Sequence, residues 1–363
     1  MKNTLGNSVA LTVFGESHGE AVGVVIDGLA SGIEVSEKEI ERFLSRRRPN
    51  GKTDTPRIEK DNFEILSGVF NGKTTGTPIC IVVKNENTQS KDYLKDIIRP
   101  SHADFVANEK YAGFQDYRGG GHFSGRVTAG IVASGAILKN ALKNVGVDIG
   151  VHISSCAGVK DREFSCYEKD ISILKDLEFP VLDEKASKEM QKRILLSKAE
   201  GDSVGGSIEA VITGMPVGVG EPWFDSLESM LSHALFSIGA VKGVEFGLGF
   251  GFAEAKGSDV NDEFILDGEK IKTKTNNNGG INGGISNGMP ITFRCAVKPT
   301  PSISKIQSTV DIEKMEQVKT SIKGRHDPAI VRRICPVIES LTALVICDML
   351  AVKFGTDFLR SGK

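Results

Sequence analysis

The order in which strand-like and helix-like segments follow one another most constrains the fold of this 363-residue chain. Short runs of β-branched and apolar residues predict strands over 9–14, 22–26, 63–70, 78–83 and 207–213. Apolar residues at helical spacing predict helices over 36–48, 125–145, 227–236 and 330–354, with a further charged, helical stretch within 176–201. Strands and helices do not alternate strictly, which favours an α+β fold over a doubly wound sheet. Since no internal repeat or linker divides the chain, we expect a single domain over 1–363.

Three local signals refine these helices. Ser36 and Glu39 form a capping box at the start of the first helix. Ser134 and Gly135 place small residues in the middle of the apolar face of 125–145, which predicts close packing of another element there. Pro336 is expected to delay the start of the last helix or to kink it.

The composition is that of an ordinary soluble protein. The net charge is -2, so the chain as a whole has no electrostatic reason to bind nucleic acid or a membrane surface. The start of the chain lacks a signal-peptide pattern and no run reaches the length of a membrane span, so we expect a cytoplasmic protein. The six cysteines are widely scattered, which predicts free, mostly buried thiols and no metal site.

The stretch GESHG, Gly15 to Gly19, fits the G-x-S-x-G pattern of a serine hydrolase nucleophile elbow. An elbow follows a central strand and borrows a backbone N–H from the loop after an earlier strand, whereas only fourteen residues precede Gly15 here. We therefore interpret GESHG as a turn between two strands and keep Ser17 hydrolysis as an alternative. His18 becomes the stronger candidate, because an imidazole in a glycine-flanked turn can approach a ligand and titrates near neutral pH.

Basic residues gather in three separate segments, 45–57, 99–126 and 323–333. A solvated helix end would also explain the first of them, because cations complement the helix dipole there. In the second segment, Gly119–Gly121 stand among Arg118, His122, Ser124 and Arg126 just before a predicted helix. That combination predicts a phosphate cradle, although a triple glycine can also be a flexible loop.

Glycine is over-represented, with 41 residues, about 11% of the chain against an average of about 7%. Glycines cluster in NNNGGINGGISNG, residues 276–288, and the stretch KPTPS follows at 298–302. With the basic segments, they predict a deep site for a polyanionic substrate and a phosphate-bearing cofactor. Neither a Walker motif nor a Rossmann fingerprint is present. A flavin- or phosphosugar-binding module without catalysis remains an alternative.

Eight motifs in this order resemble the chorismate synthase family: GESHG, RRRP, RPSHAD, RGGGxxSxR, AVKG, GGINGGISNG, KPTPS and GRHDP. The resemblance runs from about Gly6 to Glu339. It implies a single-domain β-α-β sandwich and a homotetramer. It also implies a lyase of aromatic amino-acid biosynthesis, the shikimate pathway, which converts 5-enolpyruvylshikimate 3-phosphate to chorismate. That reaction is a 1,4-anti elimination of phosphate that requires reduced FMN without net redox change.

The resemblance also implies roles for individual residues. His18 matches the histidine that protonates the departing phosphate, His102 the one that protonates the reduced flavin, and Asp327 the aspartate that helps flavin N5 accept the C6 proton. The implied substrate contacts are Ser17, Arg47, Arg48, Arg126 and Arg333. The implied flavin contacts are Arg47, His122, Phe123, Ser124, Gly239, Ala240, Gly283, Lys298, Pro299, Thr300, Pro301, Ser302 and Arg325.

The chain departs from the family pattern at several positions. His122 and Val127 stand where the family commonly has arginine and glutamate, and Phe123 and Gly125 also differ from RGGGRSSARE. The remaining departures are Asn50, Gly239 and Arg332. None affects His18, His102 or Asp327. Some family members reduce their own flavin with NADPH; lacking a nucleotide motif, this chain is expected to depend on a separate flavin reductase.

Overall fold

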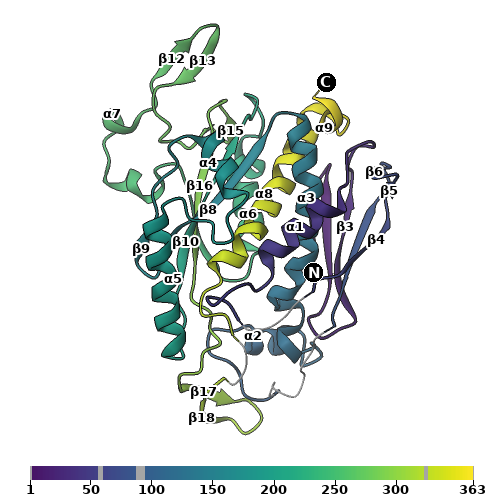
Figure 1. Ribbon diagram of the computed structural model, residues 1–363, viewed down its shortest axis with the longest axis vertical. Coiled ribbons are helices and arrows are strands. Elements are labelled where there is room, and N and C mark those ends of the chain that lie inside the picture. The colour runs from purple at the N-terminus through teal and green to yellow at the C-terminus, as the bar shows by residue number, and fades with distance from the viewer. Residues whose placement is uncertain (1, 56–59, 87–94, 323–325, 363) are drawn as a thin grey trace.

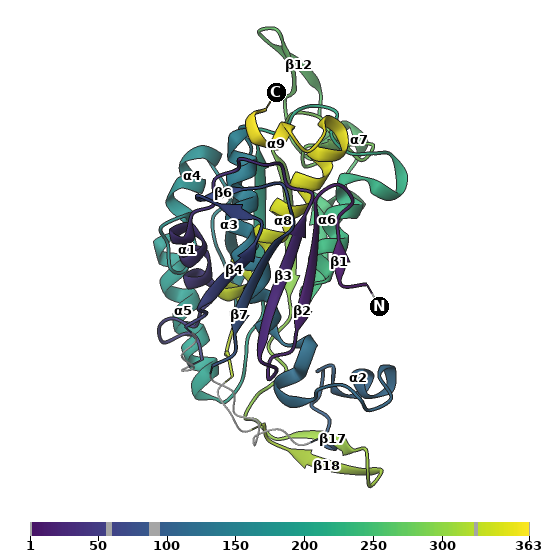
Figure 2. The ribbon, with the colours of Figure 1, turned by 90° about the vertical axis from the view of Figure 1, so that its right-hand side faces the viewer.

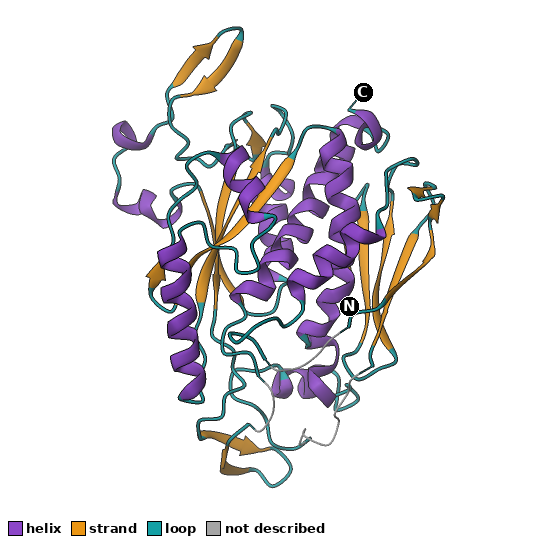
Figure 3. Ribbon diagram, in the orientation of Figure 1, coloured by secondary structure: helices purple, strands orange, loops and turns teal. Residues whose placement is uncertain are grey.

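Two five-stranded antiparallel sheets enclose a layer of helices in the computed structural model, which describes residues 2–55, 60–86, 95–322 and 326–362 (Figures 1 and 3). The first sheet has the order β1 (Thr4–Leu5), β2 (Ala10–Gly15), β3 (Ala21–Asp27), β7 (Ile79–Lys84), β4 (Phe63–Ser67). The second has the order β11 (Val241–Phe246), β16 (Ile291–Val297), β10 (Gly206–Thr213), β8 (Asp148–Cys156), β9 (Val159–Lys160). The expected α+β sandwich is confirmed.

The remaining elements connect or flank these layers. The helices are α1 (Glu37–Arg47), α2 (Asp104–Lys110), α3 (Thr128–Asn144), α4 (Tyr167–Leu174), α5 (Glu184–Ala199), α6 (Leu227–Phe236), α7 (Gly257–Val260), α8 (Val331–Phe354) and α9 (Phe358–Ser361). Short 3-10 helices cover Arg118–Phe123, Gly125–Val127, Trp223–Asp225 and Gly249–Glu254. The small hairpins are β5 (Val69–Phe70) with β6 (Lys73–Thr74), β12 (Phe264–Asp267) with β13 (Lys270–Thr273), β14 (Ile281–Asn282) with β15 (Ile285–Ser286), and β17 (Gln307–Asp311) with β18 (Glu316–Thr320).

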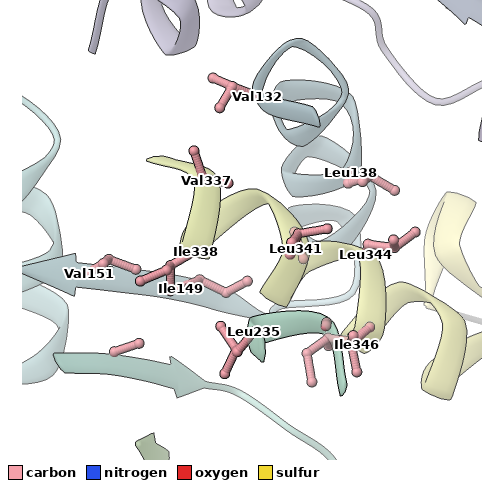
Figure 4. Close-up of a cluster of buried hydrophobic side chains, with 14 of the residues drawn as sticks. Val132, Leu138, Ile149, Val151, Leu235, Val337, Ile338, Leu341, Leu344 and Ile346 are labelled. Carbon is pink, nitrogen blue, oxygen red and sulfur yellow. The ribbon is translucent and has the colours of Figure 1, made fainter. Parts of the chain in front are cut away.

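Helices α3 and α8 form the centre of the core, with α3 packed against β3 and α8 against β8. Figure 4 shows apolar side chains of both helices beside Ile149 and Val151 of β8. The expected close approach is present, because a Cβ at Gly135 would collide with the Ser340 hydroxyl of α8. Helix α8 begins at Val331 and continues through Pro336, so the proline does not delay the start of the helix. Burial on nearly every face explains this tolerance, because tertiary packing outweighs the cost of one lost backbone hydrogen bond.

Helix α8 is long and apolar enough to cross a membrane by composition alone, contrary to the expectation that no segment would be. Its most apolar window has a mean hydropathy of 1.9 and lies entirely inside the protein, as in the core helix of a soluble protein. The helix also buries the carboxylate of Asp348, which accepts hydrogen bonds from the backbone N–H groups of Asn7, Ser8 and Val9 at 2.7–3.0 Å. These bonds fix the start of the first sheet against the core.

Helix α1 begins as the sequence predicts, with the Ser36 hydroxyl accepting from the Glu39 N–H at 3.3 Å. It ends at Arg47, with Arg48 as the C-terminal cap before Pro49. The predicted strands and helices are all present, although the charged stretch 176–201 is helical only from Glu184 to Ala199. The cysteines are free, and four of the six are buried. Helix α2 and the β17–β18 hairpin lie together at one end of the long axis (Figure 2).

Candidate active site

The GESHG stretch is a turn between two antiparallel strands, β2 and β3, with Gly15 paired to Val22. A nucleophile elbow requires a strand followed by a helix, so this geometry argues against the hydrolase alternative. Ser17 is only 3% exposed, and its hydroxyl donates to the Arg118 carbonyl at 3.1 Å. Its proton is therefore engaged by the backbone of the neighbouring glycine-rich turn.

Residues Gly119, Gly120 and Gly121 all have left-handed backbone conformations, with φ of 61°, 86° and 53°. A Cβ at Gly119 would lie 2.5 Å from His18 Nε2, and one at Gly120 would lie 3.2 Å from His102 Cε1. The glycines therefore let one turn touch both candidate histidines, which come from segments more than eighty positions apart in the sequence. The three glycines have non-helical backbone angles, and the chain enters α3 only after a further 3-10 turn, Gly125–Val127, so the predicted phosphate cradle stays a prediction.

His102 precedes α2 and belongs to a compact charged group. Its Nδ1 lies 2.7 Å from Asp104 Oδ1 and 3.0 Å from an Arg99 guanidinium nitrogen. Arg99 also donates to both carboxylate oxygens of Asp104, at 2.7 and 2.8 Å. Burial raises the pKa of Asp104, but the hydrogen bonds from Arg99 and His102 outweigh it and hold the pKa well below its usual range.

Several backbone and side-chain contacts hold the GESHG turn in place. The Ser17 N–H donates to the Gly121 carbonyl at 3.1 Å, and His122 Nδ1 donates to the Gly15 carbonyl at 2.8 Å. The Asn85 side-chain amide donates to the carbonyls of Glu16 and Gly19, each at 2.9 Å. His122, which departs from the family pattern, therefore helps to hold the GESHG turn in place.

An arginine cluster lies beside these turns, around the buried carboxylate of Asp61. Arg47 donates to Asp61 at 3.0 Å, to Thr128 Oγ1 at 3.1 Å and to the Gly125 carbonyl at 3.1 Å. Arg126 pairs with the other Asp61 oxygen. Arg126 also donates to Asn85 Oδ1 at 2.8 Å and to the Lys84 carbonyl at 2.9 Å.

The arginine cluster is almost fully shielded from solvent. The side chains of Arg47 and Arg126 are 3% and 6% exposed, and that of Asp61 is fully buried. Arg48 is more accessible and pairs with Glu41 at 2.5 Å. Since each nitrogen of Arg47 and Arg126 already has a protein acceptor, these two side chains are held rigidly in place.

The first turn of α8 ties the third basic segment to the end of α1. Arg332 donates to the Arg46 carbonyl and Arg333 to the Arg47 carbonyl, each at 2.9 Å. Cations at the last carbonyls of a helix complement its dipole. Arg333 also pairs with Asp327, whose second oxygen accepts from the Thr55 N–H at 3.0 Å. Asp327 therefore lies against the arginine cluster.

A cavity of about 360 Å³ opens beside His102 and Gly120, between α2 and the segment that follows β18. Its apolar lining includes Ile97, Ala107, Phe123 and Ile322. The carbonyl oxygen of the Gln115 side chain is buried on this wall and has no hydrogen-bond partner among the described residues. An apolar cavity with a few polar groups is typical of a small-molecule site.

Most of the predicted flavin contacts lie in three places: beside the cavity, in the 298–302 segment with Gly239–Ala240, and in the β14–β15 hairpin. Phe123 lines the cavity, and Ser124 caps the 3-10 turn that begins at Gly125. The Lys298 N–H donates to the Ala240 carbonyl at 2.9 Å, and Lys298 Nζ donates to the Ser101 carbonyl at 2.8 Å, next to His102. The structure therefore joins the 298–302 segment and Gly239–Ala240 to the His102 side of the site.

Two observations mark that region as suited to an anion. Burial and the nearby Lys242 lower the pKa of Lys298, because both disfavour its positive charge. The Thr300 hydroxyl is buried without a hydrogen-bond partner among the described residues. Pro299 packs against Gly205, and Ser302 is buried. An anion would offset the charge of both lysines.

Gly283 is not brought to this place within one chain. It lies in the turn of the β14–β15 hairpin, beside the start of α6, whereas Ala240 follows the end of that helix. The hairpin lies well along the long axis from α2 (Figure 1). Arg325, another predicted flavin contact, lies outside the described residues.

Sequence reasoning missed Asp61, Asn85 and Asp104. Asp61 and Asn85 are single polar residues whose partners lie far along the chain, so no local pattern indicates them. Asp104 was part of the quoted motif RPSHAD but received no role, although a carboxylate two residues after a histidine is a usable signal. Its pairing with Arg99 and His102 emerges only from the fold of the loop before α2.

The sandwich of two sheets and the glycine turn between two histidines define the site of a small-molecule enzyme. Comparison with known proteins shows which class: the chorismate synthase family model matches residues 9–351. Curated chorismate synthases from Methanothermobacter thermautotrophicus and Dehalococcoides mccartyi are 47% and 46% identical, and the matches cover 95% and 98% of this chain and 93% and 98% of the relatives. The chain belongs to the chorismate synthase family, and it is a carbon–oxygen lyase.

A solved structure supports the fold assignment independently. The crystal structure of a chorismate synthase superposes with a TM-score of 0.77 at 31% sequence identity, covering 98% of this chain and 95% of that one. The family resemblance drawn from the eight sequence motifs is therefore confirmed, as is the β-α-β sandwich.

Proposed function

We propose that this chain converts 5-enolpyruvylshikimate 3-phosphate to chorismate by 1,4-anti elimination of phosphate, with reduced FMN bound and no net redox change. The observation that carries the proposal is the glycine turn, at which His18 and His102 meet beside a cavity and next to the arginine cluster. In the elimination, the C–O bond to phosphate and the C6–H bond break while a second ring double bond forms. When bound, reduced FMN supplies electron density to the substrate.

The two histidines handle protons on either side of the turn. His18 donates a proton to the leaving phosphate, which lowers the charge that must depart. His102 holds and exchanges a proton at the cavity, where the flavin ring binds. Asp327, which is paired with Arg333, orients the group that accepts the C6 proton. Ser17, which is hydrogen-bonded to the Arg118 carbonyl, orients the turn that carries His18.

The described residues fit a flavin in this region. The cavity has apolar walls that suit a planar ring. The buried Gln115 side-chain oxygen can accept a hydrogen bond from the cofactor. Lys298 and the Thr300 hydroxyl, followed by Pro301 and Ser302, suit the more polar part of the cofactor. Gly239 and Ala240 bring backbone to the same place. His122, Phe123 and Ser124 are the remaining proposed flavin contacts, and of these Phe123 lines the cavity.

The arginine cluster balances the negative charge of a substrate with two carboxylates and a phosphate. Arg48 and Arg333, whose side chains are 18% and 16% exposed, are the better placed for direct contact. Arg47 and Arg126 lie behind them. Their positive charge favours the bound substrate, and their hydrogen bonds hold the glycine turn in place. Arg47 was also predicted to touch the flavin, a contact that its shielding by Asp61 and Thr128 disfavours. Arg325 keeps its predicted flavin contact as a hypothesis.

The wider assignments follow the family. We infer one catalytic domain over 1–363, supported by a large hydrophobic cluster whose members range from Val9 to Leu359. A homotetramer would account for Gly283, which lies in the β14–β15 hairpin apart from the other proposed flavin contacts of the same chain. The protein is assigned to the cytoplasm, with a separate flavin reductase as electron source. Oxidation of NADPH by the purified chain with FMN would contradict the need for that reductase.

The decisive experiment measures phosphate release from 5-enolpyruvylshikimate 3-phosphate under anaerobic conditions with dithionite-reduced FMN. The wild type turns over, and His18→Ala loses at least about a hundredfold in kcat, the scale of a positioned general acid. His233→Ala, which removes an exposed histidine of α6, retains the wild-type rate. Absence of turnover in the wild type would refute the proposed reaction. A near-normal rate for His18→Ala would remove its assigned role.

The two alternatives have their own readouts. Stoichiometric labelling of Ser17 by a fluorophosphonate would favour the hydrolase. Tight binding of FMN and substrate without any phosphate release would favour a binding module.

A further inference from the structure

We propose that Asp104 is a positioning residue, which fixes His102 with its proton on Nδ1 and thereby makes Nε2 the nitrogen that exchanges a proton at the cavity. The proposal deepens the proposed function, since it rests on His102 as a proton carrier. Its geometric basis is independent of that function, because it concerns which ring nitrogen holds the hydrogen in the protein alone.

The contacts of Nδ1 determine the tautomer. Asp104 Oδ1 lies 2.7 Å away, and a nitrogen of Arg99 lies 3.0 Å away. If Nδ1 accepted from Arg99, its lone pair would face a carboxylate oxygen at hydrogen-bond distance, which is repulsive. If Nδ1 carries the hydrogen, it donates to Asp104, and Arg99 donates to the same oxygen at 2.7 Å. The second arrangement satisfies all three groups.

The carboxylate itself is held rigidly. The Arg99 side chain donates to both of its oxygens, and the Arg99 backbone N–H donates to Oδ2 at 2.9 Å. Asp104 is also the first residue of α2, where a negative charge is favoured by the helix dipole. The His102 side chain is only 19% exposed. An imidazole held by so fixed an acceptor has little freedom to turn.

The opposite edge of the ring faces Gly120 and the cavity. A Cβ at Gly120 would stand 3.2 Å from His102 Cε1 and 3.5 Å from Nε2, so only glycine leaves this edge open. His102 and Gly120 both line the cavity. Nε2 is therefore the nitrogen that a bound molecule can reach.

Charged groups surround the ring. Asp104 contacts Nδ1 directly, and Arg99 holds Asp104 in place. Lys298 reaches the Ser101 carbonyl from the second sheet, and Lys95 and Asp116 line the same cavity. At 2.7 Å the Nδ1–H contact to Asp104 is as short as the Arg99–Asp104 pair, and a hydrogen bond to a carboxylate is stronger than one between neutral groups.

The test uses the full chain with isotope-labelled histidine, and proton–nitrogen correlation spectra that identify the protonated ring nitrogen. The His102 signal is assigned from its loss in His102→Gln. In the wild type at about pH 8, where an ordinary histidine is neutral, the hydrogen is expected on Nδ1. A hydrogen on Nε2 would overturn the proposal, whatever any variant does.

Asp104→Asn gives the matching functional readout. The asparagine amide donates to Nδ1 and moves the hydrogen to Nε2, so kcat is expected to fall at least about tenfold while KM for the substrate stays within about twofold. Asp104→Glu restores the Nδ1 hydrogen and part of the rate. An unchanged tautomer with an unchanged kcat in Asp104→Asn would contradict the proposal.

Asp170→Asn is the matched control. Asp170 also accepts two hydrogen bonds from an arginine, Arg162, and one from the Ser165 N–H, but no histidine contacts it in the described residues. It is expected to leave the His102 signal and kcat unchanged. A normal rate for His102→Ala would refute the proposed function of His102 while leaving the tautomer result intact, so the two failures are distinguishable.

Discussion

The arginine cluster and the two histidines share one glycine-rich loop, yet their polar atoms meet opposite surroundings. Arg47 and Arg126 are nearly inaccessible, and the protein supplies acceptors for their nitrogens, with Asp61 at the centre. His18 and His102 instead border a turn of three glycines with positive φ, and His102 lines the cavity. The two regions therefore have different tasks. The arginine cluster fixes the local fold and supplies positive charge, whereas the histidine side is open to ligands.

The largest effect is expected from breaking the cluster at its anion. Asp61→Asn leaves Arg47 and Arg126 buried without their shared carboxylate, which should lower the free energy of unfolding by about 3–5 kcal/mol. Urea unfolding measures the change. Glu41→Gln is the control, because Glu41 pairs with Arg48 but is half exposed, and should cost less than about 1 kcal/mol. Similar losses for the two variants would show that the buried cluster is not special.

A second prediction concerns the ion pairs that support the arginine cluster and do not involve the histidines. Glu339 of α8 pairs with Arg46 at 2.7 Å and with Lys139 at 2.6 Å. Burial alone would raise its pKa, but these two cations lower it from 4.5 to about 2. Because the pKa is lower in the folded state, the stabilisation is present above pH 4.5 and is lost as the pH falls toward 2.

The expected loss over that window is about 3 kcal/mol, at about 1.4 kcal/mol for each pKa unit. Urea unfolding of the wild type and Glu339→Gln across the acid range measures it. The variant is less stable at neutral pH, and its stability changes less steeply between these pH values. Equal slopes for the two proteins would contradict the role given to Glu339.

The sequence predicted local features better than the contacts of the arginine cluster, and the reason is physical. Local signals such as the Ser36 cap, the Ser134–Gly135 pair and the glycines beside His122 act over a few residues and can be read directly. The partners of Arg126 are Asp61, Asn85 and the Lys84 carbonyl, which are some forty to sixty-five positions away in the chain. Substrate-binding arginines and arginines that hold the fold look alike in sequence, because only tertiary contacts distinguish them.

The smallest effect is expected from a single methyl group on the histidine side. Gly119→Ala places a Cβ at a φ of 61° and 2.5 Å from His18 Nε2 and Cδ2. Strain at one left-handed residue should cost about 1 kcal/mol of stability. Displacement of the His18 ring should lower kcat about tenfold, since positioned proton transfer depends on hydrogen-bond geometry.

Gly125→Ala is the matched control on the same loop. A Cβ there meets nothing within 4 Å, and this glycine is not among those with positive φ. It should therefore retain the wild-type kcat under anaerobic assay with reduced FMN. If Gly119→Ala and Gly125→Ala showed the same rate, the glycine turn would not be what positions His18. The distinction between an accessible histidine side and a shielded arginine cluster would then not hold for the glycine-rich loop that both regions share.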